Sequence, residues 1–308
     1  ILNEILVQEK VVSIVKKLVS SDENSNIKTL ISILGKDELD EFEEAFKKYE
    51  TNSNIKPKDI GSPKYFQADS NICVIAIHGF SSAPKEMEKL ALFLNSKNLN
   101  VYIPRLDGHG ITPENLKTKT WQDWYNSISR TITLASLKHE KVFIVGFSTG
   151  GLLGLLSTKK HYKEFCGLIC INAALNLNDI RIKTLLPALS LWNDLVKAFN
   201  EGKYQKEYVD NYPQNPDINY DKYYIDSIAQ LNLLMKKTKK NLQKIQKPLL
   251  IIQAKDDPVV NPISAYEIFN EVKSTNKTIK MIDSSSHVIV TLEDTQELFD
   301  LIYGFIIK

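Results

Sequence analysis

Ser148 is the residue whose setting in this sequence most directly indicates covalent chemistry. It lies in the stretch VGFSTGGLLGLL, residues 145–156, with Gly146 two residues before it and Gly150 two residues after it. A β-branched and aromatic run precedes the serine and a leucine-rich segment follows it, which predicts a sharp turn from a buried strand into a helix. Such a turn strains its central residue and needs small neighbours. The pattern therefore predicts a hydroxyl presented at a sheet edge for nucleophilic attack.

A serine hydroxyl is a weak nucleophile and needs a base that is oriented by an acid. Of the five histidines, His287 in DSSSHVIV is the best candidate base, because it follows the last predicted strand at the same sheet edge as Ser148. His78, in IHGF, is expected to have a structural hydrogen-bonding role. His139 and His161 lie in polar, lysine-bearing stretches and are expected at the surface.

The acid is expected in a loop between the serine and the histidine, in the order Ser, Asp, His. The stretch LLIIQAKDDPVV places Asp256 and Asp257 directly after a buried strand. Asp283 is close to His287 in sequence but stands at a strand end, a poor position from which to reach the far nitrogen of the imidazole. The residues alone leave Asp256 and Asp257 open.

Two backbone N–H groups are expected to bind the oxyanion that forms during acyl transfer. One belongs to Thr149, which follows the serine and begins a helix. The other belongs to Phe80, in the loop HGFSS after the strand ICVIAIHG. We expect Phe80 and Thr149 to form an oxyanion hole.

Buried strands and amphipathic helices must position these residues, and from residue 70 onward the two alternate. This alternation predicts an α/β fold with a mostly parallel sheet and helices on both faces. The predicted strands are residues 72–79, 99–105, 141–147, 166–172, 247–255 and 277–283. The predicted helices are residues 83–97, 121–138, 150–160, 262–273 and 293–308.

Two segments stand apart from the alternation. Residues 1–62 are predicted to be a helical N-terminal extension and linker, followed by a domain over residues 63–308. The stretch NIKPKDIGSPKYF, residues 54–66, spans the boundary between them. Residues from about 174 to 246 are predicted to be a helical cap over the sheet edge. Its apolar residues, above all Leu189 and Trp192, are expected to line an acyl pocket.

Six motifs together resemble the α/β-hydrolase family, most of all its small bacterial carboxylesterases and monoacylglycerol lipases. They are HGF, PRLDGHG, TWQDW, GFSTGG, QAKDDPVVNP and SSSHVI, in this order over about residues 63–308. The resemblance implies that Asp257 is the acid, because the family pattern is Asp-x-Val/Ile, and it implies a compact helical cap. Residues 1–60 depart from the family pattern, and the resemblance implies no role for them.

Composition excludes several function classes. The chain has 308 residues, a net charge of +2 and mixed charge signs, so no nucleic-acid partner is expected. Its three cysteines lie in apolar runs, which predicts buried thiols and no metal site. The sequence contains neither a membrane-spanning run nor a signal-peptide pattern, so a cytoplasmic location is expected. The chain begins at Ile1, which leaves an upstream signal or anchor open.

The sequence therefore predicts a serine hydrolase that cleaves small carboxylic esters of short to medium acyl chain, with monoacylglycerols among the candidate substrates, without a cofactor. Thioester or lysophospholipid hydrolysis at the same residues stays open, as does a binding protein that kept the fold without activity. The lysines at the end of the cap are expected to form a solvated helix face. The N-terminal amphipathic segment leaves open a membrane surface, a dimer contact or docking on the core. The oligomeric state is not predicted.

Overall fold

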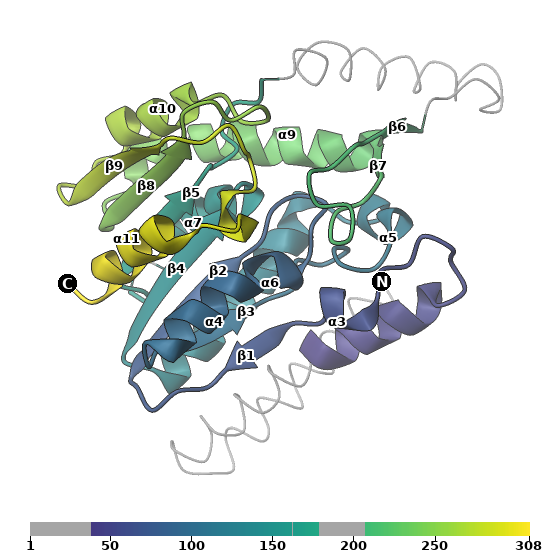
Figure 1. Ribbon diagram of the computed structural model, residues 1–308, viewed down its shortest axis with the longest axis horizontal. Coiled ribbons are helices and arrows are strands. Elements are labelled where there is room, and N and C mark those ends of the chain that lie inside the picture. The colour runs from purple at the N-terminus through teal and green to yellow at the C-terminus, as the bar shows by residue number, and fades with distance from the viewer. Residues whose placement is uncertain (1–37, 162, 179–206) are drawn as a thin grey trace.

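The computed structural model describes residues 38–161, 163–178 and 207–308. One twisted sheet of seven strands runs through its centre in the order β1-β3-β2-β4-β5-β8-β9 (Figure 1). Neighbouring strands are parallel except β1, which pairs antiparallel with β3. The strands are β1 (Lys64–Phe66), β2 (Ile72–Ile77), β3 (Asn100–Ile103), β4 (Lys141–Phe147), β5 (Gly167–Ile171), β8 (Leu249–Ala254) and β9 (Lys277–Ile282).

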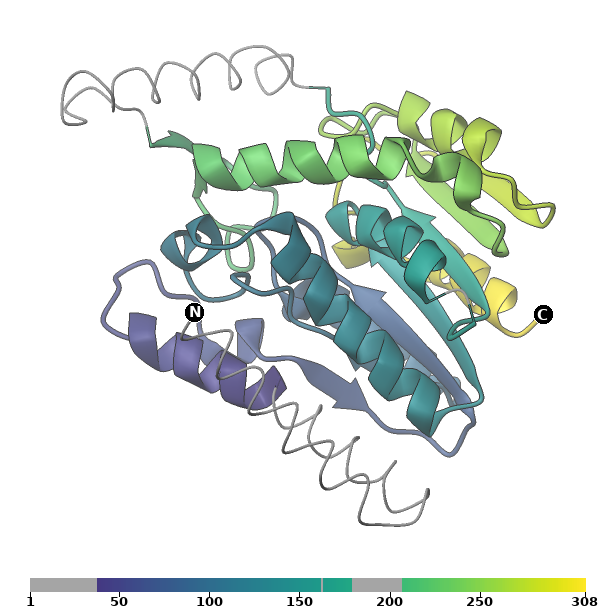
Figure 2. The same ribbon diagram turned by 180° about the vertical axis from the view of Figure 1, so that it is seen from behind.

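Helices cover both faces of this sheet (Figures 1 and 2). On one face lie α4 and α11, with the short η1 and η3, and on the other lie α6, α7 and α10. Their bounds are η1 (Pro84–Met87), α4 (Glu88–Ser96), α5 (Pro113–Lys117), α6 (Trp121–Lys138), α7 (Thr149–Lys160), η2 (Leu242–Lys244), α10 (Ile263–Glu271), η3 (Ile289–Thr291) and α11 (Gln296–Ile306).

The central strands are apolar throughout because both of their faces are covered. In β2, Val74 and Ala76 pack toward α4 and α11, whereas Ile75 and Ile77 pack toward α6 and α7. Successive side chains of a strand point to opposite faces, so a strand between two helical layers must be apolar at every position. The predicted α/β fold with a mostly parallel sheet is confirmed.

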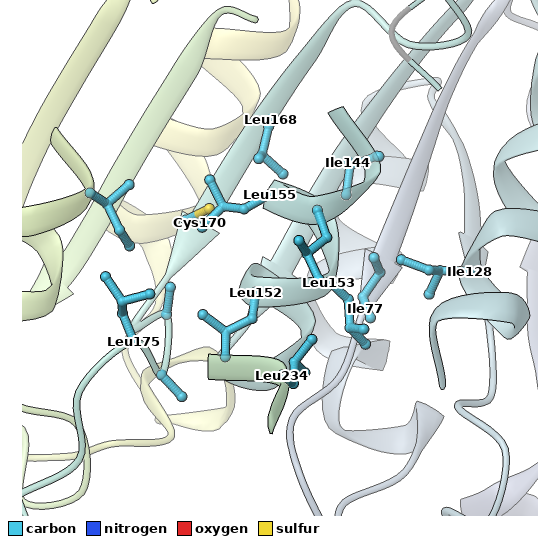
Figure 3. Packing of buried hydrophobic residues seen from close by; sticks show 14 of the residues in the cluster. Ile77, Ile128, Ile144, Leu152, Leu153, Leu155, Leu168, Cys170, Leu175 and Leu234 are labelled. Carbon is cyan, nitrogen blue, oxygen red and sulfur yellow. The ribbon is translucent and has the colours of Figure 1, made fainter. Parts of the chain in front are cut away.

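Helix α7 crosses the middle of the core. Figure 3 shows Leu152 and Leu153 of α7 beside Ile77 of the sheet and Leu234 of helix α9 (Ile225–Lys239). All four side chains are fully buried. Because α7 is held from the sheet side and from the α9 side, its N-terminal residue is placed firmly at the sheet edge.

Two details of the predicted organisation differ from the structure. The predicted linker contains a short helix, α3 (Lys58–Gly61), and the edge strand β1. The predicted helical cap contains a two-stranded antiparallel hairpin, β6 (Tyr208–Asp210) with β7 (Lys222–Tyr224), before α9. The tyrosines and the valine of these two segments favour strands, and pairing of the segments satisfies their backbone N–H and C=O groups. The helical prediction did not take this pairing into account. Leu189, Trp192 and residues 1–37 lie outside the described residues.

Residues 38–49 are helical, as predicted, and this segment packs against the sheet domain. Phe42 is fully buried, and the Arg105 guanidinium lies 5.5 Å from the centre of its ring. The buried Glu38 carboxylate accepts hydrogen bonds from Tyr102 Oη at 3.2 Å and from the Arg105 N–H at 3.1 Å. The described part of the extension is therefore docked on the core.

Two of the three cysteines and most of the lysines at the end of the cap have the settings predicted for them. Cys73 and Cys170 are buried free thiols, and Cys166 is half-buried. Most of the cap lysines are exposed at the end of α9, whereas Lys239 pairs with Glu267 at 3.1 Å. None of the helices within residues 38–161, 163–178 and 207–308 is long and apolar enough to cross a membrane.

Candidate active site

Ser148 stands alone between β4 and α7 on a strained turn. Its φ is 53° and its ψ is −114°, a backbone conformation that side chains with a Cβ rarely adopt. A Cβ on Gly146 would lie 2.3 Å from the Gly150 carbonyl oxygen, and one on Gly150 would lie 2.4 Å from the Ile77 carbonyl oxygen. Both glycines are therefore required by close backbone approaches. The predicted strand-to-helix turn is present in the structure.

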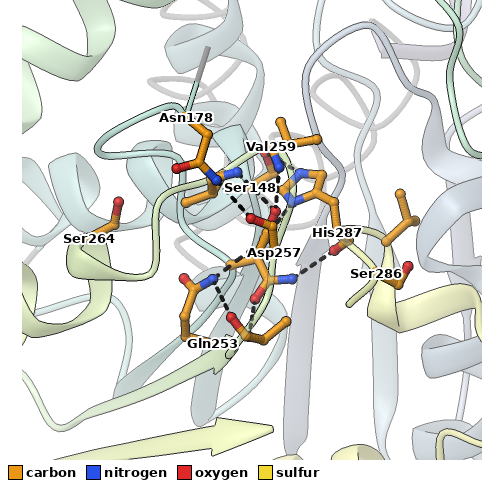
Figure 4. A network of polar contacts seen from close by, with 12 residues as sticks. Ser148, Asn178, Gln253, Asp257, Val259, Ser264, Ser286 and His287 are labelled. Atoms are coloured by element: carbon orange, nitrogen blue, oxygen red, sulfur yellow. Dashed lines mark hydrogen bonds and ion pairs between the residues drawn. The ribbon is translucent and has the colours of Figure 1, made fainter. Parts of the chain in front are cut away.

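The Ser148 hydroxyl begins a chain of hydrogen bonds through His287 to Asp257 (Figure 4). His287 Nε2 lies 3.2 Å from Ser148 Oγ, and His287 Nδ1 lies 2.8 Å from Asp257 Oδ2. The three residues come from the loops after β4, β8 and β9, which end at the same edge of the sheet. This geometry allows the imidazole to take a proton from the hydroxyl while the carboxylate fixes its tautomer.

Asp257 is buried, and its second oxygen is held by the chain that follows it. Oδ1 accepts hydrogen bonds from the N–H groups of Val259 at 2.8 Å and Val260 at 2.9 Å. The other two candidate acids lie elsewhere: Asp256 is exposed, and the Asp283 carboxylate is 88% exposed and lies 3.7 Å from Lys255. Asp257 is thus the candidate acid that meets the imidazole.

Phe80 and Thr149 line one pocket together with Ser148 and His287. Thr149 is the first residue of α7, so its N–H has no partner within the helix. Within the described part of the chain, neither the Phe80 N–H nor the Thr149 N–H donates a hydrogen bond to a protein group. Two unoccupied donors beside a serine hydroxyl are the arrangement that an oxyanion hole requires.

Comparison with known families agrees with this fold. The family described as serine aminopeptidase, S33, matches residues 68–294, which is more than half of the chain. The chain belongs to this serine hydrolase family.

Curated relatives of the same hydrolase fold extend this result. A thermostable monoacylglycerol lipase from Bacillus sp. (strain H-257) is 30% identical over 244 residues, covering 77% of this chain and 91% of the relative. A carboxylesterase from Bacillus subtilis (strain 168) is 24% identical, covering 76% of this chain and 92% of the relative. The chain is a serine hydrolase similar to monoacylglycerol lipases and carboxylesterases.

Solved structures share the fold. A metagenome-derived lipolytic enzyme superposes with a TM-score of 0.71 at 27% identity, covering 82% of this chain and 98% of that chain. A soluble variant of the Saccharomyces cerevisiae monoglyceride lipase superposes with a TM-score of 0.66 at 17% identity, covering 79% of this chain and 90% of that chain. The sheet and its helices are therefore those of an α/β-hydrolase.

The pocket of this serine hydrolase has a volume of about 330 Å³ and opens on Ser148. Its walls are largely apolar and come from the sheet edge and from the cap: Phe80, Leu177, Tyr223, Ile228, Leu231 and Val288. Polar groups of the cap, including Asn211, Gln214 and Asn219, line another part. Among the residues that the structure describes, no cluster of His, Cys, Asp and Glu is arranged to hold a metal ion.

Asn172 is a site residue that the sequence analysis missed. It follows β5 with a φ of 44°, and its buried side chain reaches the loop that carries His287. Gln214 of the cap was missed as well. Its side-chain oxygen accepts hydrogen bonds from Ser286 Oγ and from the Val288 N–H, both at 3.2 Å. Only Asn172, the last residue of a predicted strand, offered a signal, since polar residues at strand ends gather at the sheet edge.

A second serine–histidine pair lies outside this site. Ser129 Oγ lies 2.7 Å from His161 Nε2, and His161 Nδ1 lies 2.8 Å from Glu164. His161 is buried, so its predicted surface position is wrong: Ser129 of α6 and Glu164 satisfy both of its ring nitrogens away from solvent. Ser129 is inside a helix, where neighbouring N–H groups are occupied by the helical ladder. This pair therefore has no oxyanion donors at hand.

His78 is buried between two backbone groups. Its Nδ1 lies 2.9 Å from the Gly79 carbonyl oxygen, and its Nε2 accepts a hydrogen bond from the Leu106 N–H at 3.2 Å. These bonds require the neutral imidazole, and burial lowers the pKa of His78 to about 4. His78 thus ties together two loops of the sheet edge, which agrees with the structural role predicted for it.

Proposed function

We propose that this chain is an esterase that cleaves carboxylic esters through an acyl-enzyme on Ser148. The observation that carries the proposal is the hydrogen-bonded path from Asp257 through His287 to Ser148, which ends at an apolar pocket. Both distances are within the reach that proton transfer needs. The path connects a buried acid, a base and a nucleophile in the order that activated serines require.

In the first half-reaction, Ser148 Oγ attacks the ester carbonyl carbon while His287 Nε2 takes the hydroxyl proton. The carbonyl oxygen becomes an oxyanion and accepts hydrogen bonds from the Phe80 and Thr149 N–H groups. The Asp257 carboxylate accepts a hydrogen bond from the Nδ1–H group and stabilises the imidazolium. His287 then donates the proton to the alkoxy oxygen, and the alcohol leaves.

In the second half-reaction, water replaces the alcohol. His287 takes a proton from this water as its oxygen attacks the acyl carbon on Ser148. A second oxyanion forms in the same place and collapses, His287 returns the proton to Ser148 Oγ, and the carboxylic acid leaves. The residues of this chain carry all of these proton transfers, so the proposed reaction uses no cofactor.

The substrate we propose is a neutral ester with a short to medium acyl chain, and a monoacylglycerol is one such ester. The apolar walls formed by Phe80, Leu177, Ile228 and Leu231 support an acyl chain beside Ser148. The polar cap residues Asn211 and Asn219 support a hydroxyl-bearing alcohol. Relatives named monoacylglycerol lipase and carboxylesterase support the same class.

An active-site-directed phosphonate tests the nucleophile. After treatment, mass spectrometry should place the adduct on the peptide that contains Ser148, and ester hydrolysis should stop. Ser148→Ala should lower kcat on the order of 10⁶-fold, as expected when a nucleophile acting as one unit with its base is removed. Circular dichroism should show a folded variant.

Ser129→Ala is the matched control, because Ser129 is also hydrogen-bonded to a histidine. It should retain ester hydrolysis and phosphonate labelling, since the Ser129 site lacks free oxyanion donors. An adduct on the Ser129 peptide, or full turnover by Ser148→Ala, would overturn the proposal.

A further inference from the structure

Glu86 is a buried acid in the substrate pocket for which the proposed chemistry has no use. It belongs to η1, is only 1% exposed, and lines the pocket together with Ser148 and His287. Within the described residues, no ion pair joins its carboxylate to a lysine or arginine. Burying a carboxylate without such a partner costs free energy, so its presence calls for a specific contact.

That contact is with the loop that carries the Phe80 N–H. Glu86 Oε2 accepts a hydrogen bond of 2.8 Å from the Gly79 N–H. On the other side of Phe80, the Ser81 carbonyl oxygen accepts a hydrogen bond of 3.1 Å from the Tyr220 N–H of the cap. The Phe80 peptide is thus held between two anchors, and Glu86 supplies the one nearer to the serine.

The loop that carries Phe80 lies close to the nucleophile, and its backbone is strained. A Cβ on Gly79 would lie 3.3 Å from Ser148 Cβ, so the loop backbone runs directly beside the nucleophile. Ser81 has a φ of 54°, a strained value for a residue with a side chain. A strained loop relaxes when an anchor is removed, and a small displacement of a donor weakens its hydrogen bond to the oxyanion.

We propose that Glu86 is a positioning residue for the oxyanion hole, fixing the Gly79 peptide so that the next N–H, that of Phe80, points at the oxyanion. This inference rests on the proposed function, because it assigns a role to the Phe80 N–H in ester hydrolysis. Variants of Glu86 should therefore have a lower kcat and an unchanged KM, since the oxyanion exists in the transition state and the acyl chain binds elsewhere.

The charge of Glu86 adds a second consequence. Burial raises the pKa of the Glu86 carboxyl to about 6, so the group is ionised at pH 7 and above. The titratable groups that face it are the imidazole of His287, from the loop after β9, and the phenol of Tyr223, from β7. The ionised carboxylate strengthens the hydrogen bond that it accepts from the Gly79 N–H, so loss of the charge should weaken this anchor.

Three substitutions separate hydrogen bonding from charge. Glu86→Ala removes both and should lower kcat about 10- to 100-fold, a part of the loss expected for a missing oxyanion donor. Glu86→Gln keeps an acceptor oxygen at the same reach and should recover most of that kcat. Glu86→Asp keeps the charge but withdraws the oxygen by one methylene, and its kcat should fall as in Glu86→Ala.

Glu88→Gln is the matched control. It makes the same chemical change two residues away, where Glu88 pairs with Lys64 and Lys85 outside the pocket. Its kcat, KM and pH profile should equal those of the unmodified chain. Thermal unfolding of every variant reports stability separately from kinetics.

Unchanged kcat in both Glu86→Ala and Glu86→Asp would overturn the inference, and so would equal losses in Glu86→Gln and Glu86→Asp. If Glu86→Ala does not fold, the comparison of Glu86→Gln with Glu86→Asp decides alone. Phosphonate labelling of Ser148 in the unmodified chain distinguishes this failure from failure of the proposed function. If the unmodified chain is labelled and active, but the Glu86 variants keep its kcat, only the role of Glu86 is contradicted.

Discussion

Asn172 Nδ2 donates a hydrogen bond of 2.7 Å to the backbone carbonyl oxygen of His287. The oxygen of the same amide accepts a hydrogen bond of 2.8 Å from the Ala254 N–H, at the end of β8. One buried side chain therefore joins the end of the strand that precedes Asp257 to the loop that carries the imidazole. The amide thus links the loops of the proposed acid and the proposed base.

Asn172→Asp should lower kcat about 10- to 100-fold, because the carboxylate cannot donate to the His287 carbonyl and small displacements of catalytic groups have effects of this size. Kinetics on a p-nitrophenyl ester would measure it. Asn100→Ala is the control: Asn100 is equally buried and donates to the Ser70 and Ile72 carbonyl oxygens, but at the opposite end of the sheet. It should lose about 1–3 kcal/mol of stability with unchanged kcat. Equal kinetic losses in the two variants would mean that Asn172 acts only through stability.

Asp257→Asn should lower kcat roughly 10⁴-fold, because the amide favours the wrong tautomer of His287. The free energy of unfolding should change by much less than the activation free energy, and chemical denaturation would measure it. Asp256→Asn makes the same change one residue earlier at an exposed position and should leave kcat nearly unaltered. The opposite ranking would assign the orienting role to Asp256.

Phe42→Ala should lower the free energy of unfolding by about 3–5 kcal/mol, the usual cost of emptying a buried aromatic site. The docked extension touches the core through Phe42, through Glu38 and through an ion pair of Glu41 with Arg130 at 2.8 Å. No proposed catalytic residue lies in this contact, so kcat should stay within about twofold of the unmodified chain's value, a small change compared with the loss of a catalytic group. Leu39→Ala, at a side chain 48% exposed, is the control.

A chain that begins at Gly61 extends this test to the whole segment. It should keep ester hydrolysis and unfold at a lower temperature, because it exposes the apolar surface that Phe42 covers. Thermal unfolding and kcat on the same preparation would measure both effects. A folded truncation without turnover would show that the extension builds the site, contrary to this expectation.

Local signals explain why the serine turn could be predicted from sequence. The glycines around Ser148 are required because backbone atoms approach them closely within the turn and beside it. The strand before the turn and the helix after it are predicted by their apolar patterns. The alternation of strands and helices likewise predicts the parallel sheet. Asp257 follows the buried strand β8 and His287 follows the parallel edge strand β9, so their placement at one edge is a consequence of topology.

Contacts between distant segments explain what could not be predicted. The Asn172 amide bonds to a carbonyl 115 residues away, and no local pattern reports that pairing. His161 follows two lysines in the sequence, which suggests a surface position, yet it is buried and contacts Ser129 of α6. The hairpin in the cap and strand β1 form only through pairing with partners elsewhere, which a reading of local periodicity does not detect.

The value of kcat/KM should rise with acyl chain length until the pocket is filled and then fall. Each buried methylene is worth about 0.8 kcal/mol, or roughly a fourfold gain per carbon. A series of p-nitrophenyl and monoglyceride esters of graded length would measure the profile, and thioesters and lysophospholipids would show whether carboxylic esters are preferred. A flat profile, or a preference for acetyl esters over all longer ones, would contradict an extended acyl pocket.

Helix α9 offers a matched pair of leucines for locating that pocket. Leu231 lines the cavity beside Ile228, whereas Leu233, two residues later on the same helix, is 48% exposed. Leu231→Ala should enlarge the pocket and move the optimum toward longer acyl chains, because the space vacated by the side chain can take additional methylenes. Leu233→Ala should leave the optimum in place. If Leu231→Ala lowers only the unfolding temperature and keeps the same optimum, then Leu231 seals the cap onto the core and the acyl chain lies elsewhere.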